Sequence, residues 1–301
     1  MKMIERRAPI VEANRLSAML NAVLRTDAER FPVNVEALAL EYSMQCFPEA
    51  PITKIEGAEL PGFEGMLAPN SAKTKWRIVY NNHGRSSGRI RFTLAHEFGH
   101  YLLHRSQQQE FTCSELDMHD WDSKERALES DADTFASYLL MPLDDFRRQV
   151  NDSPISFDVL SHCATRYGVS LTAAALKWIE IAPRRAILVA SRDDHLLWAR
   201  SNAGAFRSGR YFATRKRTIQ VPAGSSLHSQ YAALPDVHSV PARMWFPAEP
   251  IDMLMTEMRF VIDHYDYTLG LLLMPETEWR RPSDEVEDEL LVPVDRLLQG
   301  K

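Results

Sequence analysis

The chain has few cysteines, no long hydrophobic run and no excess of basic residues, and each absence excludes a class of protein. Its three cysteines, Cys46, Cys113 and Cys163, form no CxxC pair and no disulfide framework, which suits a reducing compartment. No apolar stretch approaches the roughly 20 residues that a membrane-spanning helix needs. Residues 1–10 lack the apolar segment of a secretory signal. We therefore expect a soluble, cytoplasmic protein that does not enter a membrane.

The charge balance disfavours a general nucleic-acid binder. Lysine and arginine total 35 against 41 aspartates and glutamates, so the formal net charge is -6. Binding along a phosphate backbone needs the opposite sign over the binding surface. Residues 164–180 loosely resemble a helix-turn-helix, which keeps direct DNA binding as an alternative. Its second segment, Leu171–Leu176, is apolar and carries few groups for base edges or phosphates, so this alternative is disfavoured.

Length and hydrophobic pattern predict two domains and a tail. A chain of 301 residues is long enough for about two domains. Up to residue 183 the apolar residues recur with the helical period of about 3.6, and beyond it the period changes toward the 2 of strands. We predict a first domain over residues 1–183, a smaller β-rich domain over 184–275, and an acidic, mobile tail over 276–301.

The first predicted domain is mainly helical with short strands. Its patterns predict helices over about 11–42 with a break at Phe31-Pro32, over 92–104, over 124–141, and as a pair over 155–181. Pro142 ends the third helix because proline cannot continue a helix interior. Trp76–Tyr80 is the best strand candidate. It has two compatible interpretations, an ordinary sheet strand and a strand that pairs with an extended substrate by β-addition.

The second predicted domain has the pattern of strands. Ala186–Ala190 and His195–Ala199 are expected to form a hairpin around a polar turn. The further strand candidates are Arg210–Ala213, Thr218–Val221, Ser239–Phe246, Met253–Val261 and Tyr267–Met274. From its position alone, we expect this domain to recognise the substrate or a signal.

The segment His96-Glu97-Phe98-Gly99-His100 has the pattern H-E-x-x-H. Helix residues rise about 1.5 Å each, so the two histidines lie about 6 Å apart on nearly one face, where both nitrogens can reach one zinc ion. Glu97 lies beside them, where a carboxylate can take a proton from a metal-bound water. Glycine inside a helix costs about 1 kcal/mol relative to alanine, so Gly99 indicates close packing of a neighbouring helix.

A third metal ligand must come from another element. His104 continues the histidine series but lies about 12 Å along the axis from His96, so we expect it to be structural or to support a ligand. The helix at 124–141 offers Glu129 and Asp133 on one face. In this arrangement the glutamate ligates, and the aspartate accepts the outer N–H of a ligating histidine and fixes its tautomer. A solvated acidic face is the alternative, which the neighbouring H-E-x-x-H helix disfavours.

Two separated segments resemble the signatures of the ImmA/IrrE family of metallopeptidases. The first is Arg91–His104, RFTLAHEFGHYLLH in one-letter code, and the second is Glu129–Pro142, with the pattern E-x-x-A-D-x-F-A-x-x-L-L-M-P. Ile78–Asn81 and the helical pair around Tyr167–Ser170 are similar as well, so the resemblance covers roughly residues 10–181. Many members carry asparagine where this chain has Asp133, and either side chain can accept a hydrogen bond. The resemblance does not extend over residues 184–301.

This resemblance implies a zincin-like (gluzincin-like) metallopeptidase domain of helices with a small sheet. Together with the smaller β-rich domain that the change in period predicts after it, the expected fold class is α+β. It implies Zn2+ bound by His96, His100 and Glu129, supported by Asp133, with Glu97 as general base. Members of the family cleave helix-turn-helix transcriptional repressors, so such a repressor is the expected protein substrate. The alternative function is a non-proteolytic regulatory partner of a repressor or of a toxin–antitoxin type system.

Peptide hydrolysis also needs a donor for the developing oxyanion besides the metal. The sequence offers several candidates without choosing among them: Tyr80, Tyr101, His104, His119 and Tyr138.

Overall fold

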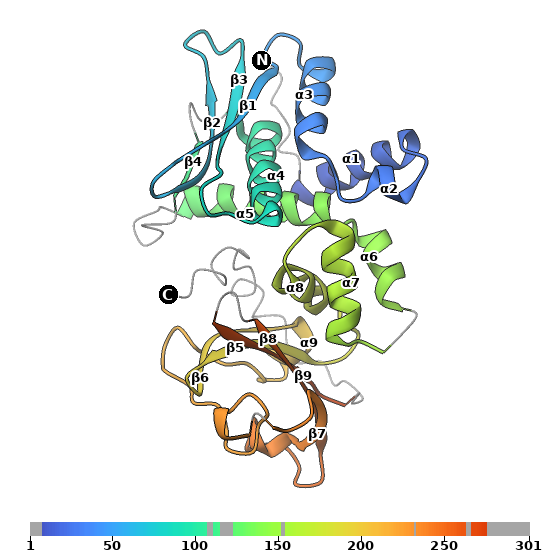
Figure 1. Cartoon of the computed structure of the whole chain (residues 1–301), viewed down its shortest axis with the longest axis vertical. Coiled ribbons are helices and arrows are strands. Elements are labelled where there is room, and N and C mark those ends of the chain that lie inside the picture. The colour runs from blue at the N-terminus through green and yellow to red at the C-terminus, as the bar shows by residue number, and fades with distance from the viewer. Residues whose placement is uncertain are drawn as a thin grey trace. The chain divides into compact units, whose positions relative to one another are not determined.

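The computed structural model describes residues 8–106, 111–114, 123–151, 154–231, 233–262 and 266–275. The acidic tail that we expect over residues 276–301 lies outside these ranges. The described chain divides into two compact units (Figure 1). The first unit contains residues up to 151 together with His162–Ser170, and the second contains residues 154–161 and the chain from Leu171. The domain boundary at residue 183 stays a prediction.

A four-stranded sheet forms one part of the first unit. Its strands follow the order β1-β3-β2-β4, with bounds β1 (Ile52–Ala58), β2 (Phe63–Pro69), β3 (Trp76–Asn81) and β4 (Phe111–Ser114). β3 pairs in parallel with β1 and antiparallel with β2, while β2 also pairs antiparallel with β4. Both edges of β3 are therefore occupied. The expectation that Trp76–Tyr80 pairs with a substrate is wrong, because only an edge strand has free backbone groups.

Helices form the rest of this unit. They are α1 (Pro9–Val23), α2 (Asp27–Arg30), α3 (Val35–Cys46), α4 (Ser87–His104), α5 (Ser123–Leu140), α6 (Leu143–Asn151) and α7 (Phe157–Tyr167), the last of which crosses the division between the units. The predicted break at Phe31-Pro32 is confirmed, since α2 ends before it and α3 begins after it. α4 begins earlier than the predicted residue 92, because the Ser86 side chain accepts a hydrogen bond from the Arg89 amide at 3.3 Å and caps the helix.

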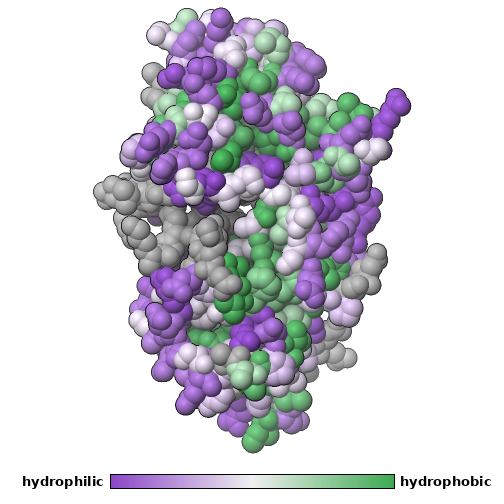
Figure 2. Space-filling view, in the orientation of Figure 1, coloured by the Kyte–Doolittle hydropathy of each residue, from purple (hydrophilic) through white to green (hydrophobic). Residues whose placement is uncertain are grey.

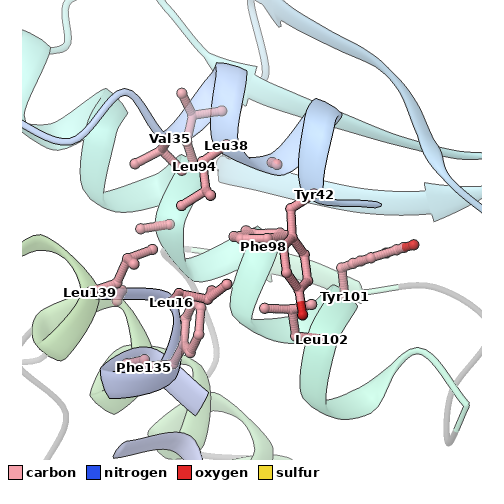
Figure 3. Close-up of a cluster of buried hydrophobic side chains, with 14 of the residues drawn as sticks. Leu16, Val35, Leu38, Tyr42, Leu94, Phe98, Tyr101, Leu102, Phe135 and Leu139 are labelled. Atoms are coloured by element: carbon pink, nitrogen blue, oxygen red, sulfur yellow. The ribbon is translucent and has the colours of Figure 1, made fainter. Parts of the chain in front are cut away.

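A hydrophobic core fixes α4 against its neighbours (Figure 3). Phe98 and Tyr101 of α4, Phe135 and Leu139 of α5 and Leu16 of α1 are completely buried. The rings of Phe98 and Phe135 meet edge to face, with centroids 5.9 Å apart. Fully burying one such side chain contributes about 1.5–3 kcal/mol, so this core holds α4 and α5 in a fixed register.

Gly99 allows these two helices to approach closely. A Cβ atom added at Gly99 would lie 2.9 Å from Cδ1 of Phe135 and 3.3 Å from Cα of Ala132. Cβ atoms essentially never come within 3.0 Å of such an atom, so a larger residue would push α5 away. The close packing that we predicted at this glycine is confirmed.

The second unit is built on a five-stranded antiparallel sheet in the order β6-β5-β9-β8-β7. Its strands are β5 (Ala186–Arg192), β6 (His195–Ser201), β7 (Val237–Pro241), β8 (Leu254–Ile262) and β9 (Tyr267–Leu273). The predicted hairpin is confirmed, and Asp193 and Asp194 adopt positive φ angles of 50° and 58° at its turn. The α+β fold with a β-rich C-terminal region is therefore confirmed.

Three of the predicted strands in this region are wrong in whole or in part. Arg210–Ala213 forms no strand, because the Arg210 amide bonds to the Ala205 carbonyl of α9 (Ala203–Arg207) and not to a neighbouring strand. Within Thr218–Val221 only Gln220 makes a β-bridge, to His195. The third strand, predicted over Ser239–Phe246, ends at Pro241, where a short 3-10 helix begins.

Helix α8 (Leu171–Ile181) belongs to the second unit and packs against β5 and β6. The Thr172 hydroxyl also lies 2.9 Å from the Tyr267 hydroxyl of β9. On the viewed surface of each unit, hydrophobic residues are interleaved with hydrophilic ones (Figure 2). Scattered exposed apolar side chains, such as Val11, Val23 and Ile251, are ordinary for a protein surface.

Candidate metal centre

Helices α4 and α5 bring three possible metal ligands together. Nε2 of His96 lies 3.0 Å from Nε2 of His100. The Glu129 carboxylate faces both rings, with Oε2 3.1 Å from His96 Nε2 and Oε1 3.2 Å from His100 Nε2. Within the part of the chain that the structure describes, this is the group of histidine, cysteine and acidic side chains whose ligand atoms all lie within 4.8 Å of one another. The group can hold a metal ion.

Asp133 contacts the first histidine of this group. Its Oδ1 atom lies 2.8 Å from Nδ1 of His96, and both side chains are buried. A carboxylate accepts hydrogen bonds and does not donate them when it is ionised, so the proton of the His96 ring lies on Nδ1. The lone pair of Nε2 then points toward His100 and Glu129. This is the supporting position that the sequence predicts for Asp133.

Burial sets the protonation of the second histidine. His100 is completely buried, and this burial lowers its pKa to about 4. The ring is therefore neutral at pH 7, which is the form that binds a metal. Burial alone would raise the pKa of the Glu129 carboxyl, but the facing rings of His100 and His96 outweigh it and hold this pKa below its usual range. The three side chains thus offer two imidazole nitrogens and one carboxylate oxygen.

The side chain of Glu97, a residue of α4, lies against β2. It is completely buried, and the chain leaves room for it with a glycine in the strand. A Cβ atom added at Gly65 would lie 2.7 Å from Oε1 of Glu97 and 2.6 Å from Cγ2 of Thr93. We did not predict a role for Gly65 from the sequence, although an isolated glycine within a strand often marks a close approach of this kind.

His104 lies beside the group and not within it. Its Nδ1 atom is 3.0 Å from Nδ1 of His100, on the side of that ring away from Glu129. The ring is 1% exposed. Nδ1 of His104 therefore contacts Nδ1 of His100, the ring nitrogen of His100 that faces away from Glu129. This position agrees with the supporting role that we expect for His104.

The structure narrows the candidates for an oxyanion donor. The Tyr101 hydroxyl donates a hydrogen bond to the Ala50 carbonyl at 2.8 Å, and the Tyr101 side chain is buried in the hydrophobic core. Tyr101 is therefore unsuited to this role. His119 lies outside the described residues.

In metal-dependent peptidases, an H-E-x-x-H helix provides two histidine ligands and faces a helix that bears a third ligand, which is acidic. Residues 58–178 match the family model of the IrrE N-terminal-like domain, a range that includes α4 and α5. The chain therefore carries a domain of the ImmA/IrrE metallopeptidase family, and the resemblance of its two signatures is confirmed.

No curated protein matches the chain. Among the described helices, none combines the length and apolar character needed to cross a membrane.

Proposed function

We propose that this protein is a zinc-dependent endopeptidase in which His96, His100 and Glu129 bind Zn2+. The convergence of their donor atoms carries this proposal, with separations of 3.0, 3.1 and 3.2 Å. Two ligands that each lie about 2.1 Å from a tetrahedral zinc ion are separated by roughly 3.4 Å. A small expansion of the group would therefore accommodate zinc.

The donor set is also that of a catalytic site. Two imidazole nitrogens and one carboxylate oxygen leave a fourth position open, whereas structural zinc sites take four protein ligands. When bound, zinc polarises a carbonyl group and lowers the pKa of water toward about 7. The carboxylate of Glu97 is the group that takes the proton from the attacking water and returns it to the leaving amine. Asp133 keeps His96 in the tautomer that leaves Nε2 free to bind.

We further propose that the substrate is a helix-turn-helix transcriptional repressor, which is cut at a specific site. The family resemblance supports this choice. The β-rich region after residue 183 is proposed to recognise the repressor or an activating signal, on the ground of its position after the peptidase domain.

A comparison of new protein N-termini tests this function. Host cells would express the wild type or Glu97→Gln, which keeps the proposed ligands and removes the base. A terminus that arises only with the wild type, inside a helix-turn-helix repressor, is the expected result. Identical termini in both cultures, with both proteins folded and zinc-loaded, would favour the alternative of a regulatory partner that binds without cutting.

Direct DNA binding is less well supported. The second helix of the possible helix-turn-helix is α8, and it packs against β5 and β6. Most of its side chains are buried: Thr172, Ala174, Ala175, Leu176, Lys177, Trp178 and Ile179. A recognition helix needs exposed groups for base edges, so α8 is unsuited to this role.

A further inference from the structure

His100 has a second buried partner on the side away from Glu129. Its Nδ1 atom lies 3.0 Å from Nδ1 of His104, and the two rings are 0% and 1% exposed. At this separation the two nitrogens share one proton, so one ring donates and the other accepts. The direction of this hydrogen bond decides which nitrogen of His100 is free to bind a metal.

The positions of the other ligand atoms fix the direction of the hydrogen bond between His100 and His104. Nε2 of His100 is the atom that faces both His96 and Glu129, so it must offer a lone pair to a metal. A neutral imidazole carries one N–H, so a lone pair on Nε2 leaves the proton on Nδ1. His100 then donates to Nδ1 of His104. His104 must in turn carry its own proton on Nε2.

Asp131 of α5 favours this arrangement of protons. Its Oδ2 atom lies 3.7 Å from Nε2 of His104, which is too long for a hydrogen bond but close enough for the negative charge of the carboxylate to act on that nitrogen. A negative carboxylate favours a proton on the nitrogen that faces it. The opposite tautomer of His104 would turn a lone pair toward Asp131 and donate a proton to His100, which would leave the proton of His100 on Nε2.

We infer that His104 and Asp131 are positioning residues that hold His100 in its metal-binding tautomer. Each metal-binding histidine then has its own acidic residue on α5, Asp133 directly for His96 and Asp131 through His104 for His100. The inference rests on the metal site of the proposed function and does not depend on peptide cleavage.

Zinc affinity tests this inference through three variants. Competition with a chromophoric chelator would compare the wild type with His104→Ala, His104→Asn and the exposed-site control His162→Ala. We expect His104→Ala to bind zinc about 10–100-fold more weakly, the usual loss when a ligand's outer partner is removed. His104→Asn carries an amide oxygen near the position of Nδ1, so it still accepts from His100 and should recover most of the affinity. His162→Ala should match the wild type.

A histidine 15N spectrum of the zinc-loaded wild type tests the same inference without a substitution. We expect a proton on Nδ1 of His100 and a proton on Nε2 of His104. A proton on Nδ1 of His104 would overturn the inference, as would equal zinc affinity of the wild type and a folded His104→Ala protein. Equal losses in His104→Ala and His104→Asn would also overturn it, because they would point to packing alone.

The outcomes separate this inference from the proposed function. A protein that shows these differences in zinc affinity but cleaves no protein would contradict the endopeptidase and leave the inference intact. Failure of the wild type to bind zinc would overturn both.

Discussion

Glu97 lies on the same helix as two of the proposed ligands, and its carboxylate has no access to solvent. If it is the general base, Glu97→Gln should keep its zinc and lose about 100- to 10,000-fold in kcat, the usual contribution of general-base catalysis. The measurement is the cleavage rate of the substrate identified from new termini, beside the zinc content of each protein. Glu41→Gln, on the exposed side of α3, is the matched control and should retain full activity. Full activity of Glu97→Gln would contradict the role of Glu97 as general base.

Asp133 gives a second prediction for a single residue, because it touches the outer nitrogen of His96 at 2.8 Å. Asp133→Ala should weaken zinc binding about 10–100-fold, since the ring of His96 would lose the partner that fixes its tautomer. Asp133→Asn should lose much less, because the amide oxygen still accepts the Nδ1 proton. Chelator competition measures both variants, and a larger loss in Asp133→Asn than in Asp133→Ala would contradict this role.

Single residues of the site differ in how well the sequence indicates them. The spacing of His96, Glu97 and His100 lies within one helix turn, so local geometry was enough to bring them together. The contact between Asp131 and His104 depends on the register of α5 against α4, and the packing of Phe98 and Phe135 sets that register. No local pattern carries this information.

At the scale of elements, β2 presses against the buried Glu97. In Gly65→Ala, the new Cβ atom would lie 2.7 Å from Oε1 of Glu97, so the carboxylate must move. A displacement of about 1 Å can cost on the order of 100-fold in rate. We expect a loss in kcat of this order with unchanged zinc content and little change in KM.

A matched glycine distinguishes this effect from a general cost of alanine. A Cβ atom added at Gly204 of α9 would meet only ordinary contacts of 3.6 Å, so Gly204→Ala should keep full activity. Loss of zinc in Gly65→Ala, or full activity of that variant, would contradict the proposed contact between β2 and the base.

Elements with a long, regular pattern were predicted well, and short ones were not. The 3.6-residue period of α5 and the polar turn between β5 and β6 are local signals, and both elements occur where we expect them. The strand β4 (Phe111–Ser114) was missed because four residues carry no measurable period, and its pairing partner β2 is distant in sequence. α6 (Leu143–Asn151) was missed because it begins directly after Pro142. The proline indicates the end of the preceding helix but gives no sign that a new helix begins.

At the scale of the molecule, two ion pairs that share Arg166 join three helices of the first unit. The Asp145 carboxylate of α6 accepts hydrogen bonds from Arg166 Nε at 2.8 Å and from the Tyr167 hydroxyl at 2.7 Å. Arg166 also bonds to Asp27 of α2 at 2.8 Å. Burial alone would raise the pKa of Asp145, but its hydrogen bonds to Arg166 and Tyr167 outweigh this and lower it.

This cluster predicts how stability depends on pH. Because the folded protein lowers the pKa of Asp145 below the usual value of about 3.9, its stabilisation is complete above that pH and is lost as the pH falls through the folded pKa. Asp145→Asn should lower the free energy of unfolding by roughly 1–3 kcal/mol at pH 7. Urea unfolding at pH 7 and below pH 4 should show this difference shrinking in acid. A difference that is the same at both pH values would contradict the role of the charge.

The sequence predicted the α+β class of the whole molecule from a change in period, but it could not give the strand orders. Backbone pairing between β1 and β3, or between β5 and β9, joins segments separated by other elements. Which strands pair depends on how all of the apolar faces are covered at once, and a single sequence does not reveal that.

The most direct test of the central claim is the metal content and metal coordination of the purified protein. X-ray absorption at the zinc edge would be measured on the wild type and on Glu129→Ala. We predict one tightly bound zinc per chain in the wild type, with two imidazole nitrogens and one carboxylate oxygen at about 2.0–2.2 Å from the zinc ion. Glu129→Ala should lose the carboxylate ligand and bind zinc more weakly. A wild-type protein without zinc, or with an identical zinc environment in Glu129→Ala, would contradict the account.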